Sequence, residues 1–308
     1  MEFAGRGYTA NRGSYWREVG GFDPQAAEKG TLEMNRRLLR VGACRRLAVG
    51  LSVSLATCAV AASSASAALT SHGQLLHLSS NTNSSSNWFG YNQGTLEQGD
   101  KLFNSITGDW TVPTATQHTA GQAEDSSDWI GIGGGCIDAG CTATDSTLIQ
   151  TGTEQDVDST GAASYSAWWE LVPAPSLTIS NMTVEPGDHM HASISEVVAD
   201  SDVWTITIQD VTRNESFTQT APYPSTHASA EWIEETPLEI GTDAGFASLP
   251  NLTNPAFTSA TVNGAPAGLK ASEELDLTDS NGNVIGAPSA PNSSADGFDD
   301  CAWASTCS

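Results

Sequence analysis

Positive charge is almost absent from most of this chain. The 308 residues include 12 Lys and Arg against 36 Asp and Glu, and nine of the basic residues precede residue 68. Only Lys101, Arg213 and Lys270 follow it, among 31 acidic residues, so the formal net charge of residues 68–308 is about −28. Such a surface repels nucleic acid and anionic lipid. We therefore expect neither as a partner.

The same acidity has two interpretations. Repulsion among the carboxylates weakens as they become protonated near their pKa of roughly 4. We interpret the composition as tolerance of acid, and a surface of the halophile type is the alternative. The charge does not by itself indicate disorder, because tryptophan and β-branched residues are plentiful.

Long hydrophobic runs are also rare. The candidate, residues 47–62, follows Arg45 and Arg46 and precedes Ala65-Ser66-Ala67. A membrane anchor is the alternative interpretation, but a spanning helix needs roughly 20 apolar residues. A basic region, an apolar region and a small-x-small cleavage site are typical of a secretory signal. We expect residues 34–67 to be a signal peptide and the protein to be secreted and extracellular, without membrane contact after cleavage.

The signal defines the expected domain organisation. Residues 1–33 precede a suitable initiator, Met34, and we interpret them as a wrongly assigned start or a remnant of an expression vector. Cleavage after Ala67 leaves a length that suits one large all-β domain. Residues 68–84 are rich in Ser and Asn, which indicates a flexible leader or a short propeptide. The folded domain is expected at residues 85–308.

Cysteine is scarce as well. Two of the six cysteines lie in the signal, which leaves Cys136, Cys141, Cys301 and Cys307. Four cysteines allow three connectivities, and local pairing, Cys136 with Cys141 and Cys301 with Cys307, is the simplest in an oxidising compartment. The Cys-x-x-Cys spacing of many zinc sites does not occur. We expect disulfides, and neither a metal nor a cofactor.

After the signal, no amphipathic pattern of three helical turns appears, and the sequence is typical of β-structure instead. Within residues 202–210, apolar and polar residues alternate from Trp204 to Gln209. Residues 107–112 and 164–172 are strand-like segments, each followed by proline. Asn281-Gly282 indicates a hairpin turn. Many short strands separated by Gly, Pro and Asn predict an all-β sandwich.

One strand-like segment presents an uncharged amide. Leu148, Gln150 and Gly152 share one face of an extended segment, while Ile149 points to the other. A glutamine between apolar residues is most often a polar residue satisfied at a strand edge. The functional alternative is an amide that holds a water and donates to an oxyanion.

A second segment presents carboxylates. Glu231, Ile233 and Glu235 alternate with Trp232 and Glu234. A charge run of this kind is most often a solvated face, although its apolar neighbours would raise a carboxyl pKa by desolvation. A base that works in acid needs a carboxylate still ionised there, held by an amide or acid partner. Which of Glu234 and Glu235 faces a groove depends on strand regularity, because a bulge would exchange them.

Two more strings complete a pattern. Trp129-Ile130-Gly131-Ile132 and Ala167-Trp168-Trp169-Glu170 join Leu148–Gly152 and Ala230–Glu235. Taken in chain order, from about Asn87 to Glu235, the four strings resemble those of the glutamic peptidases (eqolisins, peptidase family G1). The Gly-Ile-Gly-Gly form is the one expected of bacterial members. The resemblance implies a lectin-like (concanavalin-like) β-sandwich of two curved antiparallel sheets, with the catalytic pair on the concave face.

The resemblance also implies roles for individual residues. It assigns catalysis to Gln150 and Glu235. It assigns substrate binding to Trp88, Gly90, Trp129, Gly152, Trp168 and Glu170. Fungal members typically have Asp at the positions of Gly133 and Ser166, and these departures put the pH optimum and the subsite preference in doubt more than the reaction.

The implied function is a secreted acid endopeptidase. A water held between Glu235 and Gln150 would attack the scissile carbonyl directly, with no acyl-enzyme and no metal. Its partners would be protein or peptide substrates, and we expect a monomer.

Two other classes remain open on the residues alone. The tryptophans could form the sugar platform of a non-catalytic carbohydrate-binding β-sandwich module. Glu170 and Glu235 could instead be the paired carboxylates of a glycoside hydrolase. Gln150 discriminates among the three, because only the peptidase needs it.

Overall fold

The computed structural model describes residues 69–73, 83–240 and 245–308. The expected signal peptide and residues 1–33 lie outside these ranges. Within them the chain is almost entirely β-structure, and the helical element is the 3₁₀ turn Ala271–Glu273. The all-β prediction is therefore confirmed. No helix in the described ranges is long and apolar enough to cross a membrane.

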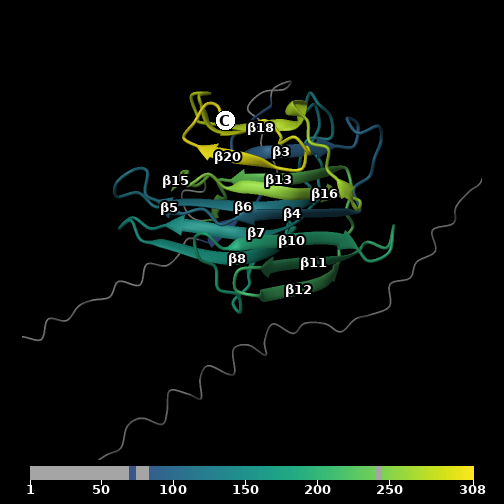
Figure 1. The fold of residues 1–308 in the computed structure, drawn as a ribbon, viewed down its shortest axis with the longest axis horizontal. Helices are drawn as coiled ribbons and strands as arrows, with labels where there is room; N and C mark the ends of the chain where they lie inside the picture. Colours follow the sequence, from purple (N-terminus) through teal and green to yellow (C-terminus); the bar gives the residue numbers. More distant parts are fainter. Residues whose placement is uncertain (1–68, 74–82, 241–244) are drawn as a thin grey trace, which may run out of the picture. The chain divides into compact units, whose positions relative to one another are not determined.

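One antiparallel sheet, here called the site sheet, carries every residue predicted above to act in catalysis or substrate binding. Its strands lie in the order β18, β3, β13, β6, β7, β8, β9, and Figure 1 shows most of this series stacked from β18 to β8. Their bounds are β18 (Glu274–Thr278), β3 (Trp88–Gly94), β13 (Ser229–Glu235), β6 (Glu124–Gly133), β7 (Leu148–Val157), β8 (Ala163–Val172) and β9 (Leu177–Thr178).

A second series of strands packs against the first, which gives the predicted sandwich (Figure 1). Its order is β12, β11, β10, β4, β16, and β20 and β19 join its end to β18 of the site sheet. The bounds are β12 (Glu215–Pro222), β11 (Val203–Asp210), β10 (His189–Glu196), β4 (Ser105–Thr111), β16 (Ala256–Val262), β20 (Phe298–Ala302) and β19 (Val284–Pro288).

The two sheets differ in how their strands are buried. In β11 and β4, buried residues alternate with less buried ones, as expected for strands with one face on the core. In β3, β6 and β13 every residue is buried, so both faces of these strands are covered. The core between the sheets includes Ile106, Ile130, Ile149, Ile206 and Phe257.

Two tryptophans connect the sheets through their indole N–H groups. Trp110 of β4 donates to Thr153 Oγ1 of β7 at 2.9 Å, and Trp232 of β13 donates to the Thr107 carbonyl of β4 at 2.8 Å. Both rings are buried, and a buried indole N–H normally requires such a partner. These bonds join the core-facing side of the site sheet to the second sheet.

The predicted cross-links and the predicted hairpin are present. Disulfides join Cys136 to Cys141 and Cys301 to Cys307, which confirms local pairing. β18 and β19 form a hairpin whose turn is organised by Asp279. Its carboxylate accepts hydrogen bonds from Asn283 and Asn281, which lower the Asp279 pKa to about 2.

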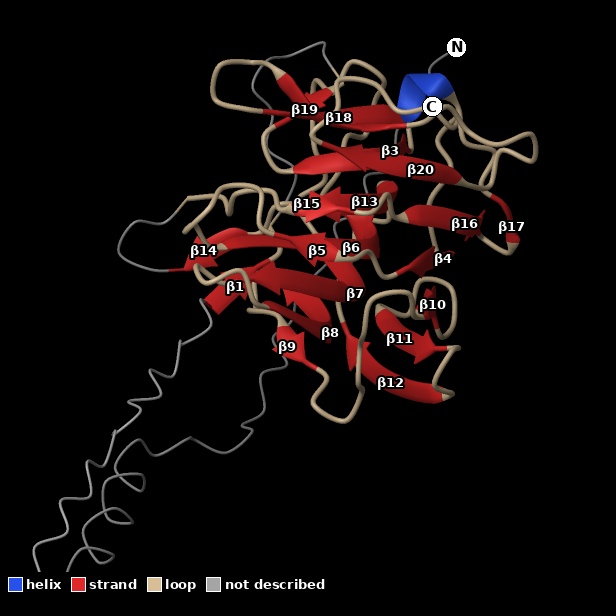
Figure 2. Ribbon diagram, turned by 60° about the vertical axis from the view of Figure 1, so that its left-hand side comes forward, coloured by secondary structure: helices blue, strands red, loops and turns tan. Residues whose placement is uncertain are grey.

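The leader is the part of the fold that differs most from expectation. We expected residues 68–84 to be flexible, yet residues 69–71 form β1, which pairs antiparallel with β14 (Figure 2). His72, the next residue, is completely buried. The short strands are β1 (Leu69–Ser71), β2 (Ser84–Ser85), β5 (Ala115–Thr116), β14 (Leu238–Ile240), β15 (Asn251–Leu252) and β17 (Ala265–Pro266).

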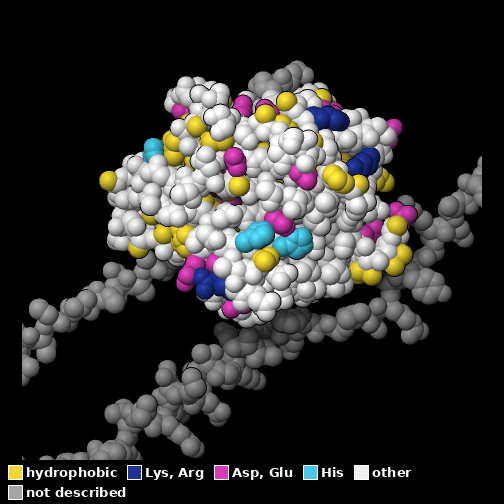
Figure 3. Space-filling view, in the orientation of Figure 1, with side chains coloured by type: hydrophobic (Ala, Val, Ile, Leu, Met, Phe, Trp, Pro, Cys, Tyr) yellow, Lys and Arg dark blue, Asp and Glu magenta, His cyan; other side chains and the backbone are white. Residues whose placement is uncertain are grey.

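The surface reflects the acidic composition. Figure 3 shows few Lys and Arg side chains on the face formed by the second sheet. Arg213, one of three cations after residue 68, lies beside Asp188 at 2.8 Å and also contacts Glu185.

Candidate active site

The register of the site sheet places all the predicted site residues on one face. Gln150 of β7 is aligned with Gly131 of β6 on one side and with Glu170 of β8 on the other. Aligned residues share a face, and so does every second residue along a strand. This face therefore carries Trp88, Gly90, Trp129, Gln150, Gly152, Trp168, Glu170 and Glu235.

Strand β13 is regular, which decides between its two adjacent acids. Glu235 is aligned with Trp88 on β3 and with Ser127 on β6, and the pairing runs from residue 230 to 235 without a shift. Glu235 therefore points to the same side as Gln150. Glu234 points to the opposite side, towards the second sheet.

Glu235 lies in a desolvated pocket. It has no exposed surface, and its Oε2 accepts a hydrogen bond from the Trp129 indole N–H at 2.9 Å. The His72 ring Nδ1 lies 3.2 Å from the same oxygen. Burial raises the pKa of Glu235, and the contacts with His72 and Trp129 only partly oppose this effect. The pocket therefore favours the protonated form of the Glu235 carboxyl more than water does.

The Gln150 amide has its donors fixed by two acceptors. Nε2 donates to Glu170 Oε2 and to the main-chain carbonyl of His72, both at 2.8 Å. Burial raises the pKa of Glu170 to about 7. Glu170 thus orients the amide, while the second N–H of that amide holds a peptide carbonyl.

The tryptophans form the walls of the site. Trp88 and Trp129 meet edge to face, with ring centres 4.7 Å apart, and Trp168 donates to Ser127 Oγ at 2.9 Å. Trp168 presents its flat face to the ring of His72. These contacts fix the positions of the aromatic rings in the site.

Sequence reasoning did not identify His72 or Glu154 as part of this site. The His72 ring stacks on Trp168, and its Nε2 lies 3.8 Å from Glu154 Oε1. The only sequence signal for Glu154 is its spacing, since it lies four residues after Gln150 on the same strand face. His72 lies in a Ser/Asn-rich segment without periodicity, so no pattern marked it.

A second acidic group lies behind the site. Glu234, Asp128 and Asp300 are completely buried, and Gln155 Nε2 donates to both Glu234 Oε2 and Asp128 Oδ2 at 3.2 Å. Burial is the main cause that raises all three carboxyl pKa values, that of Glu234 to about 7. These groups are neutral in acid, which allows them to share hydrogen bonds in the core.

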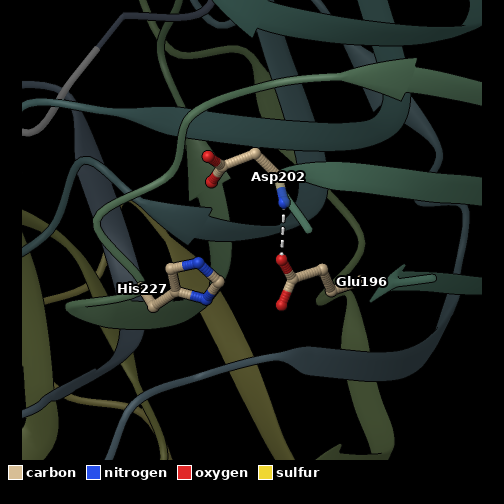
Figure 4. Close-up of side chains that lie close together, drawn as sticks. All are labelled: Glu196, Asp202 and His227. Atoms are coloured by element: carbon tan, nitrogen blue, oxygen red, sulfur yellow. Dashed lines mark hydrogen bonds between the residues drawn. The ribbon is translucent and has the colours of Figure 1, made fainter. Parts of the chain in front are cut away.

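A third group is a turn rather than a functional centre. Ligand-type atoms of Glu196, Asp202 and His227 lie within 4.8 Å of one another (Figure 4). The Glu196 carboxylate already accepts backbone N–H groups of Asp200 at 3.0 Å and Asp202 at 2.8 Å. It therefore organises the turn between β10 and β11, and we assign it no metal.

Gly152 provides a test of how tightly this sheet is packed. A Cβ at Gly152 would lie 2.2 Å from the Asp128 carbonyl oxygen and 2.5 Å from Trp129 Cβ. We expect Gly152→Ala to lower the free energy of unfolding by about 3 kcal/mol or more, because β6 and β7 must separate. Urea unfolding measures this change. Gly73→Ala, whose Cβ would meet nothing, is the control and should stay within about 0.5 kcal/mol of the parent; equal effects would contradict the packing argument.

Comparison with known proteins identifies relatives of this chain. A model of the Peptidase A4 family matches residues 86–296. Aspergillopepsin-2 from Aspergillus niger is 26% identical over 238 residues, which cover 69% of this chain and 77% of the relative. The family match spans all the residues of the site except His72.

The fold of this chain also resembles those of solved structures. Scytalidoglutamic peptidase, determined with a peptide-based transition-state analogue, superposes with a TM-score of 0.52 at 18% identity, covering 70% of this chain and 98% of that one. Aspergilloglutamic peptidase from Aspergillus niger gives a TM-score of 0.46 at 22% identity, covering 58% of this chain and 99% of that one.

Proposed function

The chain belongs to the Peptidase A4 family and is a glutamic endopeptidase, and from this premise we propose that it is a secreted acid enzyme whose water-activating pair is Glu235 and Gln150. The observation that carries the proposal is the convergence of both side chains on one residue. The Gln150 amide donates to the carbonyl of His72, and the Glu235 carboxyl lies against the ring of the same residue.

The mechanism follows from what each group can do. Ionised Glu235 removes a proton from water, and the water oxygen attacks the scissile carbonyl carbon. The Gln150 N–H that holds the carbonyl of His72 would stabilise the oxyanion, a contribution of about 3 kcal/mol in comparable sites. Protonated Glu235 then transfers its proton to the leaving nitrogen as the C–N bond breaks. Trp129 holds Glu235 in place throughout.

Glu170 supports an acid working range. Its carboxyl lies 2.8 Å from the Gln150 amide nitrogen, and its pKa is raised to about 7 by burial. Below that pH Glu170 is neutral and does not oppose a developing oxyanion on the other side of the amide. Above it, the negative charge works against the transition state. The lower limit of activity is set by protonation of Glu235.

Secretion and peptide binding rest on other observations. The signal pattern at residues 34–67 and the two disulfides are both typical of exported proteins. The peptide-based analogue found with scytalidoglutamic peptidase supports peptides as ligands of this fold. Substrates are accordingly proteins or peptides in an acidic medium.

The carbohydrate hypotheses have less support. A sugar platform needs exposed aromatic faces, whereas Trp88 and Trp129 have no exposed surface and Trp168 is 1% exposed. A glycoside hydrolase would have no use for the amide of Gln150, which lies between Glu170 and the peptide carbonyl of His72.

The proposed function predicts proteolysis that depends on Gln150. We expect the purified chain to hydrolyse a denatured protein in the acid range below about pH 7, with or without a chelator. Gln150→Ala should lower kcat by about 10²- to 10³-fold with little change in KM, because the lost hydrogen bond acts on the oxyanion. Steady-state rates on a fluorogenic peptide measure this effect.

Gln219 supplies the matched control. It lies on β12, outside the site, and its side chain donates to the neighbouring Thr220 carbonyl. Gln219→Ala should therefore retain the parent rate. Absence of proteolysis from a folded parent at every pH, or full activity in Gln150→Ala, would refute the proposed function.

A further inference from the structure

Glu231 is a buried acid on the same face of the site sheet as Gln150, but it takes no part in the proposed reaction. It has no exposed surface, and it is aligned with Asn92 on β3 and with Gly131 on β6. Gly131 in turn is aligned with Gln150, so one strand separates the two polar side chains. The charged group that acts on the Glu231 pKa among the described residues is Asp145, which is itself an acid. The sheet therefore holds a carboxyl here without a counter-ion in the described part of the chain.

The Asn92 amide beside Glu231 lacks a donor for its oxygen. Asn92 Nδ2 donates to the Cys136 carbonyl at 2.9 Å, which fixes the orientation of the amide, because the exchanged orientation would set two oxygens against each other. Asn92 Oδ1 is buried and has no hydrogen-bond donor among the described residues. A Cβ on Gly135 would lie 1.7 Å from this oxygen and 2.5 Å from Glu231 Oε1, so the two oxygens are close neighbours. The Glu231 carboxyl is the group at this place that can supply the missing proton.

The surroundings favour the protonated form of Glu231. Burial raises its pKa well above the usual range and Asp145 adds to the rise, while the Ser229 hydroxyl and the Gly135 N–H oppose it only in part. The small cleft that Asn92 also lines carries four further acids, Glu97, Asp138, Glu273 and Glu274. Ionisation would place a buried negative charge beside an acceptor oxygen, so it would cost both desolvation and a hydrogen bond.

The segment that lies on this pair is the connection between β6 and β7, residues 134–147, here called the disulfide loop. The bond between Cys136 and Cys141 closes it. Asn92 holds its Cys136 carbonyl, and Gly135 lies against the two neighbouring oxygens. The disulfide packs in one apolar cluster with three tryptophans of the site, Trp88, Trp129 and Trp168. The position of the disulfide loop therefore affects the position of the tryptophans.

We propose that protonated Glu231 donates a hydrogen bond to Asn92 Oδ1, and that this bond holds the disulfide loop on the site sheet, so that loss of the proton releases the loop. Glu231 is thus a positioning residue that acts on the tryptophans through the disulfide loop. Its contribution is complete in acid and is lost as pH rises through the raised pKa of Glu231. The hydrogen bond and the release of the loop stand on the contacts above, and only the effect on catalysis rests on the proposed function.

Two substitutions separate the hydrogen bond from the charge. Glu231→Gln is neutral at every pH and keeps an N–H that can donate to Asn92. Glu231→Leu is also neutral and of similar size, but it has no donor. If the hydrogen bond holds the loop, the two variants differ, and if only the charge matters, they agree. Glu234→Gln is the matched control, because it removes a buried carboxyl from the opposite face of the same strand.

The disulfide loop is followed by hydrogen exchange and mass spectrometry at about pH 4 and about pH 8. Protection factors of residues 135–145 are compared with those of β11 in the second sheet, because a general loss of stability lowers both. In the parent and in Glu234→Gln, the relative protection of the loop should fall by about tenfold or more at the higher pH, since a buried acceptor and a buried charge are then unpaired. Glu231→Gln should keep its protection at both pH values, and Glu231→Leu should be poorly protected at both.

The effect on catalysis is measured with a fluorogenic peptide at about pH 4. The rate of Glu231→Gln should stay within about threefold of the parent, because the hydrogen bond is retained. Glu231→Leu should lower kcat/KM by about tenfold or more, because displaced tryptophans misplace the substrate. A rate equal to that of the parent in Glu231→Leu would overturn the positioning role.

The outcomes separate this inference from the proposed function. Equal relative protection of the loop at both pH values in the parent would overturn the inference, and so would equal protection in Glu231→Gln and Glu231→Leu. A loop that responds to pH as expected, in a folded chain that digests no protein, would support the inference and refute the proposed function. An active chain whose loop does not respond to pH would overturn the inference and leave the proposed function standing.

Discussion

Glu235→Gln is expected to lower the rate of peptide hydrolysis by about 10³-fold or more, within the range typical of a lost general base. The substitution keeps the size of the side chain and an oxygen for the Trp129 indole N–H. It removes the group that, in the proposed mechanism, takes a proton from water and returns it to the leaving nitrogen. Loss of activity without loss of fold is therefore the expected result.

Glu234→Gln is the matched control because it makes the same chemical change one residue away. Glu234 faces the second sheet, where Gln155 donates to it, and its pKa is raised to about 7. In acid it is already protonated, so an amide of the same shape replaces it with little change. We expect a rate within about threefold of the parent, since near-isosteric changes away from a reacting centre have small effects.

The measurement is kcat/KM for both variants in acid, with circular dichroism to confirm the fold. Full activity in Glu235→Gln would show that Glu235 is not the general base. Inactivity of Glu234→Gln with an active Glu235→Gln would mean that β13 presents the other acid to substrate.

The second large effect concerns stability rather than catalysis. Several carboxyls that lose most of their contact with water have raised pKa values: Asp125 to about 6, Glu234 to about 7 and Asp156 to about 9, with burial the leading cause in each. Asp128 and Asp300 are raised well above their usual range for the same reason. The fold therefore favours neutral carboxyls at these positions.

The direction of the pH dependence follows from these shifts. An acid whose pKa is raised on folding stabilises the native state fully below its unfolded pKa, and this stability is lost as pH rises through the folded value. For Glu234 the loss occurs between 4.5 and about 7 and amounts to roughly 3 kcal/mol, at 1.36 kcal/mol per pKa unit. Asp156 extends the loss to about pH 9. The total free energy of unfolding of a folded domain is about 5–15 kcal/mol, so these losses are a large part of it.

We therefore expect the midpoint of urea unfolding to be highest near about pH 4 and to fall steeply towards pH 8. Acids with lowered pKa values, such as Asp279, act in the opposite direction and reduce stability only in stronger acid. Glu234→Gln should flatten the curve by removing one contributor, so it should be more stable than the parent at pH 8. A midpoint that rises from pH 4 to pH 8 would contradict the assignment.

The part of the site that could be predicted is the part set by strand alternation. Gln150 and Gly152 share a face because they are two residues apart on a regular strand, and the same holds for Trp168 and Glu170. Glu235 required one more fact, that β13 has no bulge. Short-range features were equally accessible, including the hairpin at Asn281-Gly282 and the two local disulfides.

The remainder depends on contacts that no local pattern encodes. The charge run at residues 231–235 is most often a solvated face, yet Glu231, Glu234 and Glu235 are all buried. Asp128 is similarly hidden, although its segment from residue 124 to 128 is polar at every position. The packing of the second sheet and the placement of the leader decide these burials. The role of His72 could not be predicted from the sequence, because its contacts join it to residues 78 and 163 positions away.

The pairing of β1 with β14 has a consequence for how the enzyme would bind a protein substrate. If the leader were removed, the main-chain groups of Leu238–Ile240 that pair with β1 would be free to pair with another extended chain. Main-chain pairing of this kind ignores the identity of the side chains it aligns. Selection among extended chains would then have to come from contacts outside the paired stretch.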